Sequence, residues 1–203
     1  NSLNEFLLEA KDASEIAQAR LLKAETQFAA GQYAEAAVTY GSLVPGSLPD
    51  ALRADAAYKH AWSLARTGRA QESVVAYSDF IERFPRDERI PKALVARGMA
   101  HAEAGASDAA FRDFDRVIQS HPDSKERELA MLQKGLVHGS KREYDQMRAD
   151  FEALVKAYPE STARAQAEFW IGYAKFEQKD YEGSLPHFET ARKLDAQTYG
   201  DRA

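Results

Sequence analysis

Cysteine is absent from this 203-residue sequence, which excludes disulfide bonds, thiolate metal sites and cysteine nucleophiles. This absence is compatible with both the cytoplasm and the periplasm. No stretch approaches the roughly 18 consecutive apolar residues that a membrane-spanning helix needs, so we expect no membrane span. The first residues, Asn1-Ser2-Leu3, contain neither an initiator methionine nor a signal-peptide pattern. We therefore expect a mature or excised segment of a longer protein.

The motifs of common catalytic sites are also missing. The chain has no glycine-rich phosphate loop, no His-Glu-x-x-His pair and no Gly-x-Ser-x-Gly elbow. His101-Ala102-Glu103 is similar to the start of a zinc deaminase signature, but that site needs later cysteines. His101 and His138 are spaced for neighbouring helices, and equivalent polar positions are the simpler interpretation. The sequence therefore predicts a protein that is not an enzyme, with no cofactor and no metal site.

Few residues are β-branched, whereas Ala, Leu, Glu, Lys, Arg and Gln are frequent, and this composition favours helices over strands. The formal charge is -5, although nucleic-acid binding requires clustered Lys and Arg on a basic domain. We therefore expect an all-α protein that binds no nucleic acid.

Side chains of the same kind recur every 37 residues. One column of equivalent positions is alanine throughout: Ala19, Ala56, Ala93, Ala130 and Ala167. Another is aromatic: Tyr40, Tyr77, Phe114, Phe151 and Phe188. A third contains only small residues: Ala24, Ala61, Gly98, Gly135 and Gly172. These columns define five aligned repeats.

Each repeat contains two helical patterns that are separated by a turn such as Gly31-Gln32-Tyr33. Glycine supplies the left-handed end of the first helix, and Pro85, Pro122 and Pro159 follow the second helix. The sequence predicts ten paired helices and no strand, near residues 16–30, 34–45, 52–67, 71–84, 90–104, 107–120, 126–141, 144–157, 162–178 and 182–194. Pro186 conflicts with the last range, so we expect a late helix start or a kink near Gly183.

The predicted organisation is one array over residues 1–203. Its repeats are 16–52, 53–89, 90–126, 127–163 and 164–200, and residues 1–12 have the pattern of the second helix of a preceding repeat. Thr198 to Ala203 resemble the approach to a further repeat. Neither end shows an obvious polar cap, which leaves the ends open to self-association.

These columns resemble the tetratricopeptide repeat family. Its motif has an aromatic, a Leu-Gly pair and a Tyr in the first helix, then an Ala, an aromatic and a terminal Pro. The second helices match best, and Ile171-Gly172 keeps the Leu-Gly pair. The resemblance covers nearly the whole chain and implies a right-handed α-solenoid of antiparallel helix pairs.

The family's usual repeat has about 34 residues, so this repeat is longer. The longer repeat and its turns, such as Tyr158-Pro159-Glu160-Ser161, resemble those of a bacterial periplasmic branch of the family. That branch occurs in the outer-membrane assembly lipoprotein and the Tol-Pal-associated protein. We therefore expect a periplasmic or envelope-associated protein, with the cytoplasm as the alternative.

The resemblance implies that the first helices line a concave groove that binds a ligand. Apolar and aromatic candidates for this groove are Tyr58, Trp62, Met99, Leu136, Phe169, Trp170, Tyr173 and Phe176. A polar, mostly basic column runs beside them and is broken by Ile171: Lys23, His60, Arg97 and Lys134. Buried polar residues need partners.

Two arrangements of these columns are open. In the first, which we favour, the basic column pairs with acidic groups on neighbouring helices, and an apolar groove remains for a helix or extended peptide. In the second, the first helices are rotated, so that the aromatics become core and a basic groove binds an acidic tail. The aromatics could also simply pack one helix against the next.

The predicted function is a protein–protein interaction scaffold that binds a peptide or helical segment of a partner. The alternatives are a structural spacer and a sensor or regulatory module that is attached to another domain. An exposed apolar groove of more than a few hundred Å² would favour the scaffold.

Overall fold

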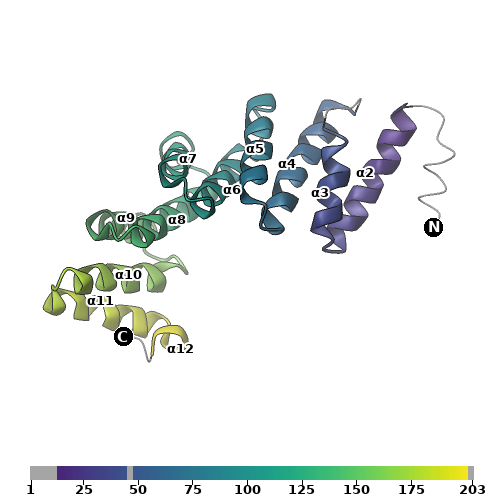
Figure 1. The fold of residues 1–203 in the computed structure, drawn as a ribbon. Coiled ribbons are helices and arrows are strands. Elements are labelled where there is room, and N and C mark those ends of the chain that lie inside the picture. The colour runs from purple at the N-terminus through teal and green to yellow at the C-terminus, as the bar shows by residue number, and fades with distance from the viewer. Residues whose placement is uncertain (1–12, 45–47, 201–203) are drawn as a thin grey trace. The chain divides into compact units, whose positions relative to one another are not determined.

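The computed structural model describes residues 13–44 and 48–200, and every regular element in these ranges is a helix (Figure 1). The paired helices are α2 Ala13–Ala29, α3 Tyr33–Gly41, α4 Asp50–Arg66, α5 Ala70–Arg83, α6 Ile90–Glu103, α7 Ser107–Ser120, α8 Glu126–Ser140, α9 Tyr144–Ala157, α10 Arg164–Glu177 and α11 Tyr181–Leu194. A short helix, α12 Ala196–Tyr199, follows them. The all-α class of successive helix pairs is confirmed, and the helix predicted over residues 1–12 lies outside the described residues.

The chain divides into two compact units, which are described separately. The N-terminal unit, residues 1–109, contains α2 to α6, and each of these helices packs against the next. The C-terminal unit, residues 110–203, contains most of α7 and α8 to α12. From α8 onward each helix again packs against the next one along the chain.

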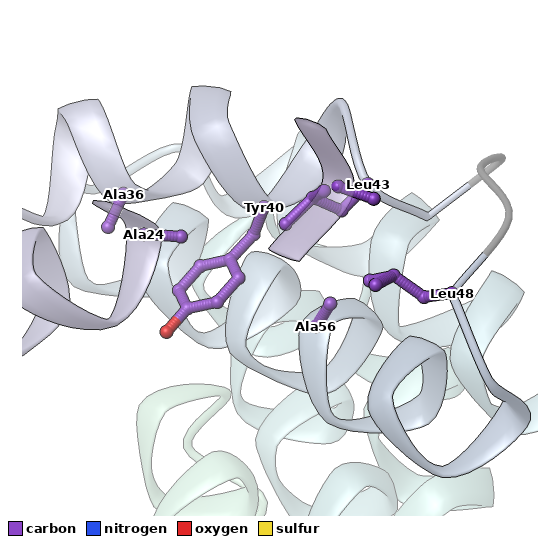
Figure 2. Packing of buried hydrophobic residues seen from close by; sticks show 7 residues of the cluster. Ala24, Ala36, Tyr40, Leu43, Leu48 and Ala56 are labelled. Carbon is purple, nitrogen blue, oxygen red and sulfur yellow. The ribbon is translucent and has the colours of Figure 1, made fainter. Parts of the chain in front are cut away.

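The recurring columns form the core of both units. Figure 2 shows the Tyr40 ring among Ala24, Ala36 and Ala56, and all four side chains are fully buried. Alanine lets neighbouring helices approach closely, and the large ring fills the space between them. Tyr77, Phe114 and Phe151 occupy the same column and are fully buried as well. The 37-residue step is therefore the spacing of one packing contact that is repeated along the array.

The small-residue column makes room for these rings. A Cβ atom added to Gly135 on α8 would lie 2.8 Å from Cζ of Phe151 on α9. One repeat later, a Cβ atom at Gly172 on α10 would lie 3.0 Å from Cδ1 of Phe188 on α11. Such distances are shorter than normal carbon contacts, so glycine allows the ring to lie directly against the first helix.

The turn inside each repeat has the same backbone shape with different residues. Gly31, Gly68 and Gly105 have φ angles of 74°, 72° and 77°, which only glycine adopts without strain. In the last two repeats the equivalent residues are Arg142 and Lys179, with φ angles of 59° and 66°. The packing of each helix pair therefore imposes the left-handed turn even where the residue disfavours it.

Helix α11 begins earlier than the sequence suggested. It runs from Tyr181 to Leu194 without interruption, with Pro186 inside it. The Asp180 side chain accepts a hydrogen bond of 3.0 Å from the Gly183 backbone N–H and thus caps the first turn. The predicted late start is therefore wrong, because this cap fixes the helix start ahead of the proline. The kink near Gly183 stays a prediction.

Replacing Phe114 by Ala should lower the free energy of unfolding by about 3 to 5 kcal/mol, because a fully buried ring is removed and leaves a cavity. Urea denaturation followed by circular dichroism measures the change. A loss of less than about 1 kcal/mol would show that the aromatic column does not carry the core.

A candidate protein-binding face on the first helices

The basic column contacts the second helix of the preceding repeat. The His60 Nδ1 atom lies 2.8 Å from the Ala37 carbonyl oxygen on α3. The Arg97 Nη1 atom donates a 3.0 Å hydrogen bond to Ser78 Oγ on α5. The Lys134 Nζ atom donates a 2.9 Å bond to Asp115 Oδ1 on α7. These three side chains therefore lie at helix interfaces.

A second column faces the basic one and changes with it. Gly41, Ser78 and Asp115 are equivalent residues of the second helices. At Gly41 the space of a side chain is taken by the His60 ring, because a Cβ atom there would lie 2.9 Å from His60 Cε1. The His60 ring thus lies against a glycine. The Arg97 guanidinium group faces a serine hydroxyl, and the Lys134 ammonium group faces an aspartate carboxylate.

The His60 ring is half-buried at its interface. Burial lowers the pKa of His60, since its backbone hydrogen bond to Ala37 does not compensate for the lost hydration of the charged ring. Lys23 is half-buried, and the helix that would precede it lies outside the described residues.

Lys134 is the centre of a charged cluster in the C-terminal unit. Its Nζ atom lies 2.9 Å from Asp115 and 3.5 Å from Asp150 on α9. Burial alone would lower the pKa of Lys134, but the hydrogen bond to Asp115 and the charge of Asp150 raise it. Burial raises the pKa of Asp150, although Lys134 and His138 oppose this shift. Lys134 therefore neutralises two carboxylates between helices.

We predict that Lys134→Ala destabilises the protein by about 1 to 3 kcal/mol at pH 7, because it leaves Asp150 partly buried without its main counter-charge. The pKa of Asp150 in the folded state would then rise further. A carboxyl group whose pKa is higher in the folded state than in the unfolded state lowers the free energy of unfolding as the pH rises above its unfolded-state pKa of about 3.9. The loss should consequently be smaller at pH 4 than at pH 7.

Urea titrations at both pH values test this prediction. Lys156→Ala is the control, because Lys156 is an exposed lysine on α9. Equal losses for Lys134→Ala at pH 4 and pH 7 would mean that Asp150 does not respond to this lysine.

Ion pairs cover part of the first-helix surface in the N-terminal unit. The Lys59 Nζ atom on α4 lies 2.8 Å from Glu25 on α2 and 2.9 Å from Asp55. Asp55 also accepts a bond of 2.7 Å from the Arg89 guanidinium group. The charges in this network largely compensate one another.

The groove candidates of the N-terminal unit differ in burial. Tyr58 is buried and packs against Phe80 with ring centroids 5.5 Å apart, so it is a core residue and does not line an open surface. Trp62 is half-buried against Phe28 and Tyr33, with centroid distances of 4.9 Å and 5.0 Å. Met99 is exposed.

The C-terminal unit also has apolar side chains on its first helices that are not fully buried. Leu136 on α8 and both Trp170 and Tyr173 on α10 are half-buried at the margin of the core. The Trp170 and Tyr173 rings meet edge to face with centroids 5.5 Å apart. Tyr144 on α9 packs against Tyr173 at 6.2 Å and extends the group. These four residues form what we call the aromatic face.

Phe169 and Phe176 on α10 also contact the helices that follow it. The Phe169 ring stacks on Tyr199 of α12 at 5.1 Å, and Phe176 packs against Tyr181 of α11 at 5.3 Å. Phe169 also meets Trp170 edge to face at 5.4 Å, and Phe169, Tyr173 and Phe176 line one open cleft. The structure thus brings these four predicted groove residues together. Tyr144 and Tyr181, which are equivalent to Tyr33, were not predicted from the sequence. Ala70 and Ser107 interrupt this aromatic column, which weakens its signal.

Residues 13–44 and 48–200 contain neither a cluster that could bind a metal ion nor a helix that could span a membrane. These residues contain no group of three or more His, Asp or Glu side chains that could hold a metal ion. In the same ranges no helix combines the length and the apolar character needed to cross a bilayer.

Successive helix pairs with a half-exposed aromatic face define a helical-repeat protein. The chain belongs to the tetratricopeptide repeat family, whose sequence model matches residues 58–125 and 132–198. The general function that this fold supports is a protein–protein interaction scaffold, and proteins of the family are generally not catalytic. No curated protein sequence matches the chain significantly.

Solved structures of the same fold are similar over most of the chain. A MamA protein is 16% identical, with a TM-score of 0.74 over 94% of this chain and 97% of the other. MamA from Desulfovibrio magneticus RS-1, from residue 41 to its end, is 15% identical with a TM-score of 0.73 over 92% and 97%. A protein from Podosopora anserina, described as a kinesin light chain with nearly identical TPR-like repeats, is 14% identical, with a TM-score of 0.71 over 93% and 99%. At these identities the likeness shows the fold alone.

Proposed function

We propose that this protein binds a peptide or helical segment of a partner protein on the aromatic face of its C-terminal unit. The observation that carries the proposal is the placement of the basic column. Because Lys134 reaches α7 and α9, the side of α8 that carries it is occupied by helix packing. Leu136, Trp170 and Tyr173 stay half-exposed.

The chemistry of this face suits a protein segment. Trp and Tyr supply large contact areas at a low cost in side-chain entropy, and they are enriched among the residues that dominate binding energy. The Tyr144 hydroxyl donates a 3.2 Å hydrogen bond to Glu177, which places a carboxylate beside the rings. We therefore expect the bound segment to present apolar side chains with a basic residue near Glu177.

Replacing Trp170 by Ala should weaken the binding of a peptide that was selected from a random library on the full chain. The expected loss is about 30-fold, which corresponds to about 2 kcal/mol for an aromatic anchor. Tyr173→Ala should have a similar effect. Fluorescence polarisation of the labelled peptide measures the affinity, and Val75→Ala is the control because Val75 is an exposed aliphatic residue on α5.

Melting curves of the same variants distinguish binding from packing. Tyr173→Ala should cost less than about 2 kcal/mol, since the ring is half-exposed. A loss of about 3 to 5 kcal/mol in both aromatic variants would instead identify these rings as core. Peptide binding that depends on Arg97 and Lys134 and weakens with added salt would favour the basic groove.

The location of the protein in the cell is part of the proposal. The 37-residue repeat supports a bacterial, envelope-associated protein, because the periplasmic branch of the family also has repeats longer than about 34 residues. Fractionation of the source cells with an antibody against the chain tests this assignment. Recovery of the full-length protein from the cytoplasm alone would contradict it.

A further inference from the structure

The N-terminal unit has an open cleft of about 590 Å³ that is lined by residues of α3, α4 and α5. Helix α4 packs against both of the other helices and contributes His60 and Leu64 (Figure 1). Val38 on α3 and Val75 on α5 occupy equivalent positions, line the cleft and are 70% and 63% exposed. Ligand sites commonly have volumes of about 300 to 1,000 Å³. We call this site the α3–α5 cleft, and it shares no residue with the aromatic face.

Small side chains leave the α3–α5 cleft open. Three of the residues that line it are small: Ala37, Gly41 and Ala76. The equivalent residues of the C-terminal unit are larger: Phe111, Asp115 and Asp150. There the Phe111 ring stacks on His138 with centroids 4.1 Å apart, and both carboxylates bind Lys134. Asp150 Oδ2 also lies 3.5 Å from His138 Nε2. Side chains therefore fill this place in one unit and leave it open in the other.

The filled place shows which chemical group suits the open one. His138, on which Phe111 stacks, is equivalent to Leu64, and Leu64 lines the α3–α5 cleft. Ala37 is equivalent to Phe111 and supplies no ring over Leu64. An aromatic ring from a ligand can occupy this position and bury a large apolar area.

Ion pairs at the rim make the cleft unattractive to charged ligands. The Arg69 Nε atom donates a 2.7 Å hydrogen bond to Glu72 Oε1. The Arg83 Nη1 atom lies 3.1 Å from Asp79 Oδ2. These four residues all line the cleft, and each carboxylate is already bound by an arginine. An uncharged side chain therefore suits the cleft better than an acidic or a basic one.

His60 supplies one hydrogen-bond acceptor to the cleft. Its Nδ1 atom lies 2.8 Å from the Ala37 carbonyl oxygen, which can only accept, so Nδ1 carries the hydrogen. Burial lowers the pKa of His60 from its usual value near 6.5, and Arg69 acts in the same direction, against the hydrogen bond to Ala37 and the charges of Glu72 and Asp79. The ring is therefore neutral at pH 7.5, and its Nε2 atom accepts hydrogen bonds. Among the described residues, none donates to Nε2.

We propose that the α3–α5 cleft binds a tryptophan side chain in a peptide segment of a partner protein, and that the indole N–H donates to His60 Nε2. The indole group matches the cleft because it is aromatic, uncharged and a donor only. The exposed Val38 and Val75 side chains favour a peptide over a free small molecule, since the residues beside the tryptophan can cover them. This site is additional to the aromatic face, which lies in the other unit.

The probe is the peptide acetyl-Ala-Ala-Trp-Ala-Ala-amide, titrated into the isotope-labelled full chain at pH 7.5. It should shift the NMR signals of Val38, Leu64, Val75 and the His60 ring nitrogens, with a dissociation constant below about 1 mM. A peptide with leucine in place of tryptophan should bind at least about fivefold more weakly, because it lacks the ring. A 1-methyltryptophan peptide, which has no indole N–H, should also bind about fivefold more weakly, which corresponds to about 1 kcal/mol for one hydrogen bond.

Variants of the protein test where the peptide binds. Val75→Asp should weaken binding at least about tenfold, because it places a charge in an apolar contact. Leu22→Asp is the matched control, since Leu22 is a 58% exposed aliphatic residue on α2 that does not line the cleft. Trp170→Ala should leave the affinity unchanged, so the cleft and the aromatic face succeed or fail separately. Circular dichroism melts should show that Val75→Asp stays folded, as expected for a residue that is 63% exposed.

Several results would overturn the proposal. One is the absence of localised shifts up to about 1 mM peptide. Equal affinities for the tryptophan and leucine peptides would exclude recognition of the ring, and equal affinity for the methylated peptide would exclude the bond to His60. If N-acetyltryptophanamide bound as tightly as the peptide, the cleft would be a site for a free small molecule. A loss of binding in Trp170→Ala but not in Val75→Asp would place the peptide on the aromatic face.

Discussion

The contact between an aromatic ring of a second helix and small residues of first helices organises this protein. Tyr40, Phe114 and Phe151 are fully buried, and glycine or alanine at the facing positions lets the ring approach the helix backbone. Each ring buries a large apolar area at a fixed place along the chain, so helix spacing follows from ring size. The left-handed turns at Arg142 and Lys179 agree with this dependence, because packing holds them in a conformation that their residue types disfavour.

The same contact decides which side of a first helix is left for a ligand. One side of each first helix packs on the second helix of the same repeat. Another side packs on the second helix of the preceding repeat. His60, Arg97 and Lys134 lie on the latter side and are held there by polar atoms of α3, α5 and α7. The half-exposed rings of α10 then remain for recognition.

The fold could be predicted from the sequence because its signal is repeated. Each column occurs five times, so one irregular residue does not hide the pattern. The predicted helix limits agree with the structure within a few residues except at α3, which ends at Gly41. The candidate face was less predictable. Tyr58 and Trp62 lie four residues apart on α4, and the packing of Tyr77 and Phe80 against Tyr58 buries it more than Trp62. The start of α11 depended on a cap by Asp180, whose local hydrogen bond outweighs the proline signal.

The pairing of the basic column with Gly41, Ser78 and Asp115 has a consequence for how such an array can change over time. Donor and acceptor belong to adjacent repeats, so the two columns must vary together. If a duplication or exchange placed Lys134 against the equivalent of Gly41, its ammonium group would lose the carboxylate that now binds it. If His60 met Asp115 instead, the ring would occupy space that a side chain now fills. The repeats share one backbone plan but are not interchangeable, because the junctions at His60, Arg97 and Lys134 each have a different chemical pairing.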